Sequence, residues 1–477
     1  MRRRNLAGLF ALSMACCMLI SGCSPVQVDG KTDVPQAATP TPGAFEGATQ
    51  EEQNTEQPVT KPDAEEGETG KEQFRFPVEK GKVLPASYLS KDQEEAVYAL
   101  TQDYAENLRD FAVESSVRIF PTVEGNYLYS PASLFMALDL CAGLTSENSA
   151  EDLMKVLGVE DREAARLQGN VLIRELSSDR EGAILRISDS MWFDRVQLPK
   201  IPQKGYQVIN DTAEILGADV YYEELVDPAT QDKINSWISD RTDEMITRLP
   251  ISPNEDTAAI LLNTLLFDKH WEREVQDEDI VKARFYPEGK SEGVEVERIE
   301  YTLDHHPYVK TEHAVSSAAM YEDGSYIIFI KPNSDEEFET VMTEDLAQVI
   351  RAYSEKDYTK PEGGYEVIFG IPMLDYTTSM KTLKTQVHEM GVESIFAMGA
   401  FEDIDSRLYV EQIAQNCRII IDRKGTKAAA VTEIEMRLGA VAMPKEEIDM
   451  RLDHEYGFVI MSDNDIPLFI GAVRDPR

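Results

Sequence analysis

The chain has 477 residues, and its 87 Asp and Glu residues against 47 Lys and Arg residues give a formal net charge of −40. A charge of this sign and size repels phosphate backbones and acidic lipid headgroups, which excludes nucleic acids and anionic membrane surfaces as binding partners. We therefore expect a solvated protein with a strongly acidic surface.

The amino terminus carries a predicted secretion signal, residues 1–22. Three basic residues, Arg2, Arg3 and Arg4, precede an apolar stretch that runs from Leu6 to Ile20. This order of a basic start, an apolar stretch and small residues is typical of a signal for export. Because the stretch is shorter than the roughly 20 residues of a permanent membrane-spanning helix, we expect it to be removed.

Cys23 stands where the cleavage is expected. Residues 20–23, Ile-Ser-Gly-Cys, resemble the bacterial lipobox, in which the cysteine is acylated and becomes the new amino terminus. The resemblance implies that Cys23 carries a lipid anchor, which would hold the protein on the extracellular face of the bacterial cell membrane without spanning it. An ordinary secretory signal that happens to contain a cysteine is the alternative.

Residues 23–83 are predicted to be a disordered tether. They are rich in Pro, Thr, Gly, Gln and Glu, and a segment of this composition cannot bury enough apolar surface to offset the entropy of ordering. The rest of the chain, residues 84–477, has no second proline-rich break and is predicted to be one domain. Its two cysteines, Cys141 and Cys417, lie in apolar contexts and are expected to be buried free thiols, although one disulfide bond is possible.

The domain mixes helical and strand patterns. Apolar residues recur at helical spacing between Ala96 and Phe111, and residues 379–391 and 232–246 also read as helices. Continuous apolar runs at residues 258–267, 326–330 and 417–422 predict strands that are buried on both faces. The fold class that follows is α+β with long strands.

Residues 425–439 have the pattern of a strand in the sequence context of a loop. Every second residue from Thr426 to Leu438 is small or apolar, and the intervening set contains every charge. This period of two is typical of a strand with one buried face, yet a glycine precedes the segment and Pro444 follows it. The pattern suggests two states, one exposed and one paired in a sheet; an ordinary edge strand or hairpin arm is the alternative.

The same segment resembles the proximal hinge of the serpins, in which a glycine is followed by Thr or Ser, a free position, a short alanine-rich stretch and a Thr. Other motifs of that family follow in the correct order. Residues 126–159 are similar to its Ser-Pro-x-Ser turn with two helices, and residues 234–246 to its Asn-x-Trp helix. Residues 261–271 match its pattern at Asn263, Phe267 and Trp271, and residues 390–396, 453–460 and 466–476 supply its C-terminal marks.

The resemblance implies the serpin fold: three β-sheets, eight to nine helices and an exposed reactive-centre loop. It also implies a serine protease inhibitor that is cleaved once, inserts the cut loop into the central sheet and traps the protease as an acyl-enzyme. The implied hinge residues are Gly425, Thr426, Ala428, Ala429, Ala430 and Thr432, and the inward-facing loop residues are Ile434, Met436 and Leu438. The implied cluster beneath the opening sheet, the shutter, consists of Ser130, Ser133, Asn263 and Gln415.

The scissile bond follows from the family's usual count of fifteen residues from Gly425. The count gives Gly439-Ala440, which would suit an elastase-like or subtilisin-like protease with a shallow primary pocket. Arg437, Leu438 and Met443 remain alternatives because the loop is somewhat long. Gln415 stands where many relatives have histidine, so the pH response of that histidine would be absent.

Other classes of function fit less well. The chain has no nucleophile elbow, P-loop or dinucleotide fingerprint, and His388 lacks the second histidine of a zinc helix, so we expect no enzyme, metal or cofactor. The serious rival is a non-inhibitory serpin that acts as a binding or structural protein. Its members typically carry charge, proline or bulk on the hinge face. This chain has no charge or proline on that face between Thr426 and Leu438, and nothing bulky before Ile434. We expect a monomer that meets a membrane only through its lipid.

Overall fold

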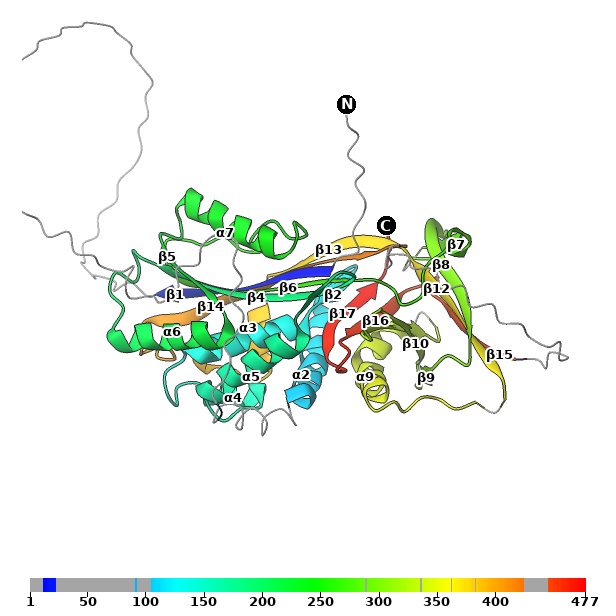
Figure 1. Ribbon diagram of the computed structural model, residues 1–477, viewed down its shortest axis with the longest axis horizontal. Coiled ribbons are helices and arrows are strands. Elements are labelled where there is room, and N and C mark those ends of the chain that lie inside the picture. The colour runs from blue at the N-terminus through cyan, green and yellow to red at the C-terminus, as the bar shows by residue number, and fades with distance from the viewer. Residues whose placement is uncertain are drawn as a thin grey trace, which may run out of the picture.

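The computed structural model of the chain (Figure 1) describes residues 12–22, 91, 104–287, 290–334, 337–361, 363–381, 383–423 and 445–477. The predicted lipid site Cys23, the predicted tether, the hinge and the expected scissile bond lie outside these residues.

The described part of the chain contains three β-sheets, as expected from the serpin resemblance. The largest has seven strands in the order β13-β14-β1-β6-β4-β3, with β5 paired to β4. The bounds are β1 Leu12–Gly22, β3 Ser178–Arg180, β4 Ala183–Asp194, β5 Asp219–Glu223, β6 Thr257–Lys269, β13 Leu374–Met380 and β14 Leu408–Ile421.

Two smaller sheets complete the β-structure. The six-stranded sheet has the order β2-β17-β16-β11-β10-β9 and the four-stranded sheet the order β15-β12-β8-β7. The bounds are β2 Tyr127–Tyr129, β7 Ile280–Phe285, β8 Val294–Asp304, β9 Tyr308–Lys310, β10 Ala314–Met320, β11 Tyr326–Pro332, β12 Tyr365–Pro372, β15 Glu446–Arg451, β16 Tyr456–Met461 and β17 Pro467–Val473.

Helices cover both faces of the large sheet. Figure 1 shows α7 on one face and α2 to α6 on the other, and α3 is buried along its whole length. The bounds are α2 Tyr104–Ile119, α3 Pro131–Leu144, α4 Glu151–Leu157, α5 Arg162–Leu176, α6 Gln203–Leu216, α7 Pro228–Arg241, α8 Phe338–Thr340, a π-helical turn Val341–Asp345, α9 Leu346–Ser354 and α10 Leu383–Glu389. Among the described helices, none combines the length and apolarity needed to cross a membrane.

The secondary structure predicted from periodicity is confirmed in its main elements. The apolar run at 258–267 is β6, whose thirteen residues are all buried. Residues 326–330 fall on β11 and are all buried. Residues 417–421 form the end of β14, where burial alternates from residue to residue, so the expected burial on both faces is wrong there. The helix expected at 379–391 is shorter, because residues up to Met380 belong to β13; past its end Gly391 has a φ of +98°, a conformation that glycine adopts without strain.

The predicted secretion signal contributes a strand to the large sheet. Strand β1, Leu12–Gly22, lies between β6 and β14 and is antiparallel to both (Figure 1, blue). The segment can be read both as an export signal and as a strand, because an export signal and a strand that is buried on both faces both require a run of apolar side chains. The structure is that of the full chain, so removal of residues 1–22 stays a prediction.

Candidate functional site

Four buried residues form a row across the large sheet. Asp189 of β4 lies opposite Asn263 of β6, Asn263 lies opposite Cys16 of β1, and Cys16 lies opposite Gln415 of β14. Their apolar neighbours at two-residue spacing, such as Met191 and Leu265, pack in the same core as α3. The period of two along each strand therefore directs the row toward α3.

The amino terminus of α3 lies under this row. Ser130 is the helix cap: its Oγ accepts a hydrogen bond from the backbone N–H of Ser133 at 3.3 Å, and Pro131 occupies the first helical position. A serine cap followed by proline is a strong signal for starting a helix. This local start places both serines against the sheet, where each is fully buried.

Ser130 connects α3 to two strands. Its backbone N–H donates to Gln415 Oε1 at 3.0 Å, and Gln415 Nε2 donates back to the carbonyl of Ser130 at 3.1 Å. Its Oγ donates to the carbonyl of Leu468 in β17 at 2.6 Å. Gln415 Oε1 also accepts a 3.3 Å contact from the thiol of Cys417.

Ser133 connects α3 to β6. Its Oγ donates a hydrogen bond to Asn263 Oδ1, and Asn263 Nδ2 donates to Asp189 Oδ1 at 2.9 Å. The structure thus brings together all four residues of the predicted shutter, Ser130, Ser133, Asn263 and Gln415. It adds Asp189, which sequence reasoning missed. The available signal was a carboxylate between Ser188 and Ser190, in a stretch flanked by Ile187 and by the apolar residues Met191 to Phe193, where an acidic residue that becomes buried needs a partner.

Asp189 is nearly inaccessible, with 4% of its surface exposed. Burial raises the pKa of its carboxyl to about 7, although the hydrogen bond from Asn263 acts in the opposite direction. The charge of Asp219 raises it further. Burial also raises the pKa of Asp139 in α3 well above its usual range, and the charge of Asp189 adds to that shift.

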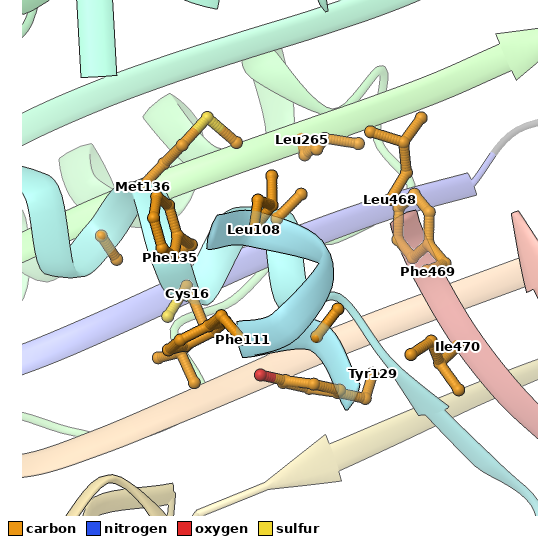
Figure 2. Close-up of a cluster of buried hydrophobic side chains, with 14 of the residues drawn as sticks. Cys16, Leu108, Phe111, Tyr129, Phe135, Met136, Leu265, Leu468, Phe469 and Ile470 are labelled. Atoms are coloured by element: carbon orange, nitrogen blue, oxygen red, sulfur yellow. The ribbon is translucent and has the colours of Figure 1, made fainter. Parts of the chain in front are cut away.

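Strand β1 shows what the position between β6 and β14 accepts. Cys16, Met18 and Ile20 pack in the main core on the α3 side, and Figure 2 shows Cys16 beside Phe111 and Phe135. Cys17 and Leu19 face the other way and pack in a smaller cluster that contains Trp192 of β4 and Trp237 of α7. We call this position between the two strands the acceptor slot. It is apolar on the α7 side, and on the α3 side it is apolar except where Asn263 and Gln415 flank Cys16.

The predicted reactive loop joins two different sheets. Before it, β14 ends at Ile421, and Trp271 Nε1 donates to the carbonyl of Asp422 at 3.3 Å. After it, β15 begins at Glu446 in the four-stranded sheet and pairs in parallel with β12. Residues 424–444 lie outside the described residues, and with them every hinge residue, the inward-facing residues Ile434, Met436 and Leu438, and the bond Gly439-Ala440.

Surface ion pairs occur at the two described ends of this loop. Arg423 pairs with Asp277 at 2.8 Å, and Lys445 pairs with Asp304 and with Glu366. Arg423 therefore has an acidic partner on the surface.

The described cysteines and acidic residues give little support for a reactive thiol or a metal site. Cys141 and Cys417 are buried free thiols, as expected. Burial raises the pKa of Cys141 to about 12, so it is a poor nucleophile. Within the described part of the chain, no group of three or more His, Cys, Asp or Glu residues is arranged to hold a metal ion.

Comparisons with known proteins agree on one family. The family model described as Serpin (serine protease inhibitor) matches residues 106–476. An "Uncharacterized serpin-like protein" of Methanosarcina acetivorans is 27% identical, over 74% of this chain and 82% of the relative. The leukocyte elastase inhibitor of Equus caballus is 24% identical, over 74% of this chain and 93% of the relative.

Solved structures show the same fold. The crystal structure of the thermophilic serpin tengpin in its native state has a TM-score of 0.63 at 19% identity, covering 82% of this chain and 96% of tengpin. Human thyroxine-binding globulin in complex with thyroxine has a TM-score of 0.65 at 18% identity, covering 78% of this chain and 98% of that protein.

Proposed function

The chain belongs to the serpin family, whose members act in general as protease inhibitors, and from this premise we propose that it is a single-use inhibitor of a serine protease. The protease cuts the loop between β14 and β15 and becomes bound to it as an acyl-enzyme. The cut loop then enters the acceptor slot as a new strand and carries the protease with it, which distorts the protease before the ester can hydrolyse.

The observation that carries this proposal is the acceptor slot itself. An eleven-residue strand fits between β6 and β14 with paired backbone along its length. The loop directly follows β14, so a loop that doubles back would run antiparallel to β14, which is the direction of β1. A segment that adds to a sheet in this way gains main-chain hydrogen bonds together with pockets for alternate side chains.

The chain length before the hinge defines the register of the inserted loop. A four-residue return from Asp422 to Gly425 places Thr426 opposite Ile421 and Thr432 opposite Gln415. Thr432 would then take the place of Cys16 in the row across the sheet, beside Asn263. A small residue with a hydroxyl group suits that position, because the cluster consists of hydrogen-bonding side chains.

The uncut protein must be held by a kinetic barrier for this mechanism to work. Insertion is favourable once the loop is free, so the uncut form survives only while the sheet stays closed to the loop. Ser133 and Ser130 bond α3 to β6 and β14 while β1 lies between these two strands, so these hydrogen bonds are compatible with an occupied slot and the barrier must lie in the entry of the loop.

Gly439-Ala440 is the proposed scissile bond, and the proposed target is an elastase-like or subtilisin-like protease. Cys23 is the proposed lipid site, and residues 23–83 are the tether that holds the inhibitor away from the extracellular face of the membrane. Removal of residues 1–22 would also remove β1 and leave the acceptor slot empty. The cleaved loop could then enter it.

A panel of serine proteases tests the proposal. The chain lacking residues 1–22 is incubated with trypsin-like, elastase-like and subtilisin-like enzymes, and the products are separated under denaturing conditions. The expected result is a covalent complex with at least one enzyme, and mass spectrometry of the released peptide locates the cut. Cleavage by every enzyme without any complex, and with an unchanged melting midpoint, would instead indicate the non-inhibitory serpin.

A further inference from the structure

A polar pocket of about 370 Å³ lies beside β13, the edge strand of the large sheet. Its walls come from the 3₁₀ turn Phe120–Thr122 with the loop after it, from the end of β13 and from the start of α10. Strand β14 separates β13 from the acceptor slot, and none of the shutter residues lines the pocket. The volume falls within the roughly 300–1,000 Å³ that small-molecule sites occupy.

Hydrogen bonds to the rest of the domain hold two of these walls in place. Asn126 Oδ1 accepts from the backbone N–H groups of Arg474 and Asp475 at 2.8 and 2.9 Å, which fixes the loop after the turn to the end of the chain. Thr378 Oγ1 donates to the carbonyl of Leu128 at 2.8 Å, which fixes β13 against β2. The pocket is therefore formed in the absence of a ligand, and binding requires little ordering of its walls.

Gln386 of α10 is the unusual residue of the lining. Only 5% of its surface is exposed, and its Oε1 has no hydrogen-bond partner within the part of the chain that the structure describes. A buried carbonyl oxygen without a partner is unfavourable, and a ligand that supplies a donor relieves this cost. Rotation about the last side-chain bond presents either end of the carboxamide to the pocket. Because a carboxamide carries an acceptor and donors together, its complement is a second amide group.

The neighbours of Gln386 combine hydroxyl groups with apolar surface. Thr377 and Ser379 are exposed residues of β13, and each hydroxyl can donate one hydrogen bond and accept two. Met380 and Leu383 also line the pocket and are buried, so they add apolar surface beside the polar groups. A ligand that fills this space therefore needs several hydroxyl groups and a small apolar part.

The charges of the lining cancel. Glu124 and Lys381, both exposed, are the only charged residues among the described residues that line the pocket. A lining without net charge favours a neutral ligand over a phosphate, a carboxylate or a cation.

We propose that this pocket binds an N-acetylated amino sugar. The acetamido group pairs with the carboxamide of Gln386, its methyl group meets the apolar surface of Met380 and Leu383, and the sugar hydroxyls bond to Thr377 and Ser379. Such a sugar is neutral and carries one amide, one methyl group and several hydroxyls, which matches each part of the lining. A plain sugar lacks the amide, and a peptide lacks most of the hydroxyls. This binding activity goes beyond the proposed protease inhibition and does not depend on it.

Saturation-transfer NMR on the full chain tests the proposal with three probes. The first is N,N′-diacetylchitobiose, and the second is cellobiose, which has the same rings and linkage with a hydroxyl group in place of each acetamido group. The third is N-acetylglycinamide, which supplies amides without a sugar. We expect the strongest transfer at the acetyl methyl groups of diacetylchitobiose, and about tenfold weaker binding of the other two, because a site that hydrogen-bonds a group discriminates against analogues that lack it.

Two variants locate the binding. Gln386→Leu removes the carboxamide at similar size and should weaken binding of diacetylchitobiose about tenfold. Its melting midpoint should be unchanged or higher, because the substitution removes a buried polar group that lacks a partner, so a loss of binding is not a loss of folding. Ser379→Tyr adds bulk at an exposed strand position and should block the pocket. Gln231→Leu, on α7 and outside the lining, is the matched control and should bind as wild type does.

Three outcomes overturn the inference. Equal binding of cellobiose and diacetylchitobiose, or no binding of either, removes the acetamido group as the recognised feature. Binding of N-acetylglycinamide as tight as that of the disaccharide assigns the pocket to peptides instead. Wild-type binding by Gln386→Leu places the sugar elsewhere on the chain. Covalent complex formation with a protease is measured on the same variants and should stay at the wild-type rate, so the sugar site and the inhibitory function can fail independently.

Discussion

Gln415 and Ser130 exchange two hydrogen bonds across the interface between β14 and the amino terminus of α3. The side chain of Gln415 accepts from the backbone N–H of Ser130 and donates to its carbonyl. The carbonyl has a second partner, the N–H of Leu134, whereas the N–H of Ser130 has beside Gln415 the weakly accepting sulfur of Cys417. One side chain thus satisfies a buried backbone donor that the helix itself cannot satisfy.

Gln415→Ala should therefore lower the free energy of unfolding by about 1–3 kcal/mol, the cost of leaving a buried donor unsatisfied. Urea unfolding of the full chain measures the effect. Gln412→Ala is the matched control, since Gln412 lies on the same strand and donates to the carbonyl of Lys381 at an exposed site. Its substitution should cost about 0.5 kcal/mol. Equal costs for the two variants would contradict the role given to Gln415.

Strand β1 and the cleaved loop should compete for the acceptor slot, because one position between β6 and β14 accepts one strand. In the full chain, where Leu12–Gly22 fills the slot, cutting the loop should leave the melting midpoint unchanged. In the chain lacking residues 1–22, the same cut should raise the midpoint strongly, because the new strand adds main-chain hydrogen bonds and buried apolar surface. Differential scanning calorimetry before and after limited proteolysis gives both values. Similar rises in the two forms would show that β1 does not hold the slot.

Much of the candidate site could be predicted because its residues belong to local motifs. Ser130 and Ser133 lie in the Ser-Pro-x-Ser turn, and Asn263 lies in the strand motif, through which the sequence resembles the serpins, so the resemblance implies each of them. Asp189 could not be found in this way. Its role depends on the register between β4 and β6, which is set by contacts between residues far apart in the chain.

The place of Leu12–Gly22 was beyond sequence reasoning for a different reason. A basic start followed by an apolar stretch describes an export signal, and the same apolar stretch satisfies a strand that is buried on both faces. The choice between them depends on whether a vacant position exists elsewhere in the fold, which no local pattern reports.

Thr432→Arg should convert the inhibitor into a substrate. The proposed register places residue 432 in the row with Asn263 and Gln415, where an arginine would be buried without a partner. We expect the target protease to cleave this variant and to form at least tenfold less covalent complex with it than with wild type. Denaturing gels of reactions at the same protease concentration measure the amount of complex. Thr432→Ser, which keeps the hydroxyl group, should retain most of the complex. Full inhibition by the arginine variant would disprove the register.

The side of the slot that faces α7 leads to a less obvious prediction. The alternation in residues 426–438 suggests that only one face of the inserted loop is buried. Yet Cys17 and Leu19 of β1, which point away from α3, are buried with Trp192 and Trp237. In the proposed register Glu433 lies opposite Ala414, which is the position of Cys17, so the inserted loop brings a carboxylate to an apolar cluster.

Glu433→Leu should therefore accelerate insertion and raise the melting midpoint of the cleaved form, because an apolar side chain replaces a charge that burial disfavours. We expect a several-fold higher rate of complex formation, roughly the effect of 1 kcal/mol on the barrier. Glu433→Gln removes the charge but not the polarity and should fall between the two. If both variants match wild type at every protease concentration, α7 must move away from the sheet before residue 433 reaches it, and the barrier to insertion lies in that movement.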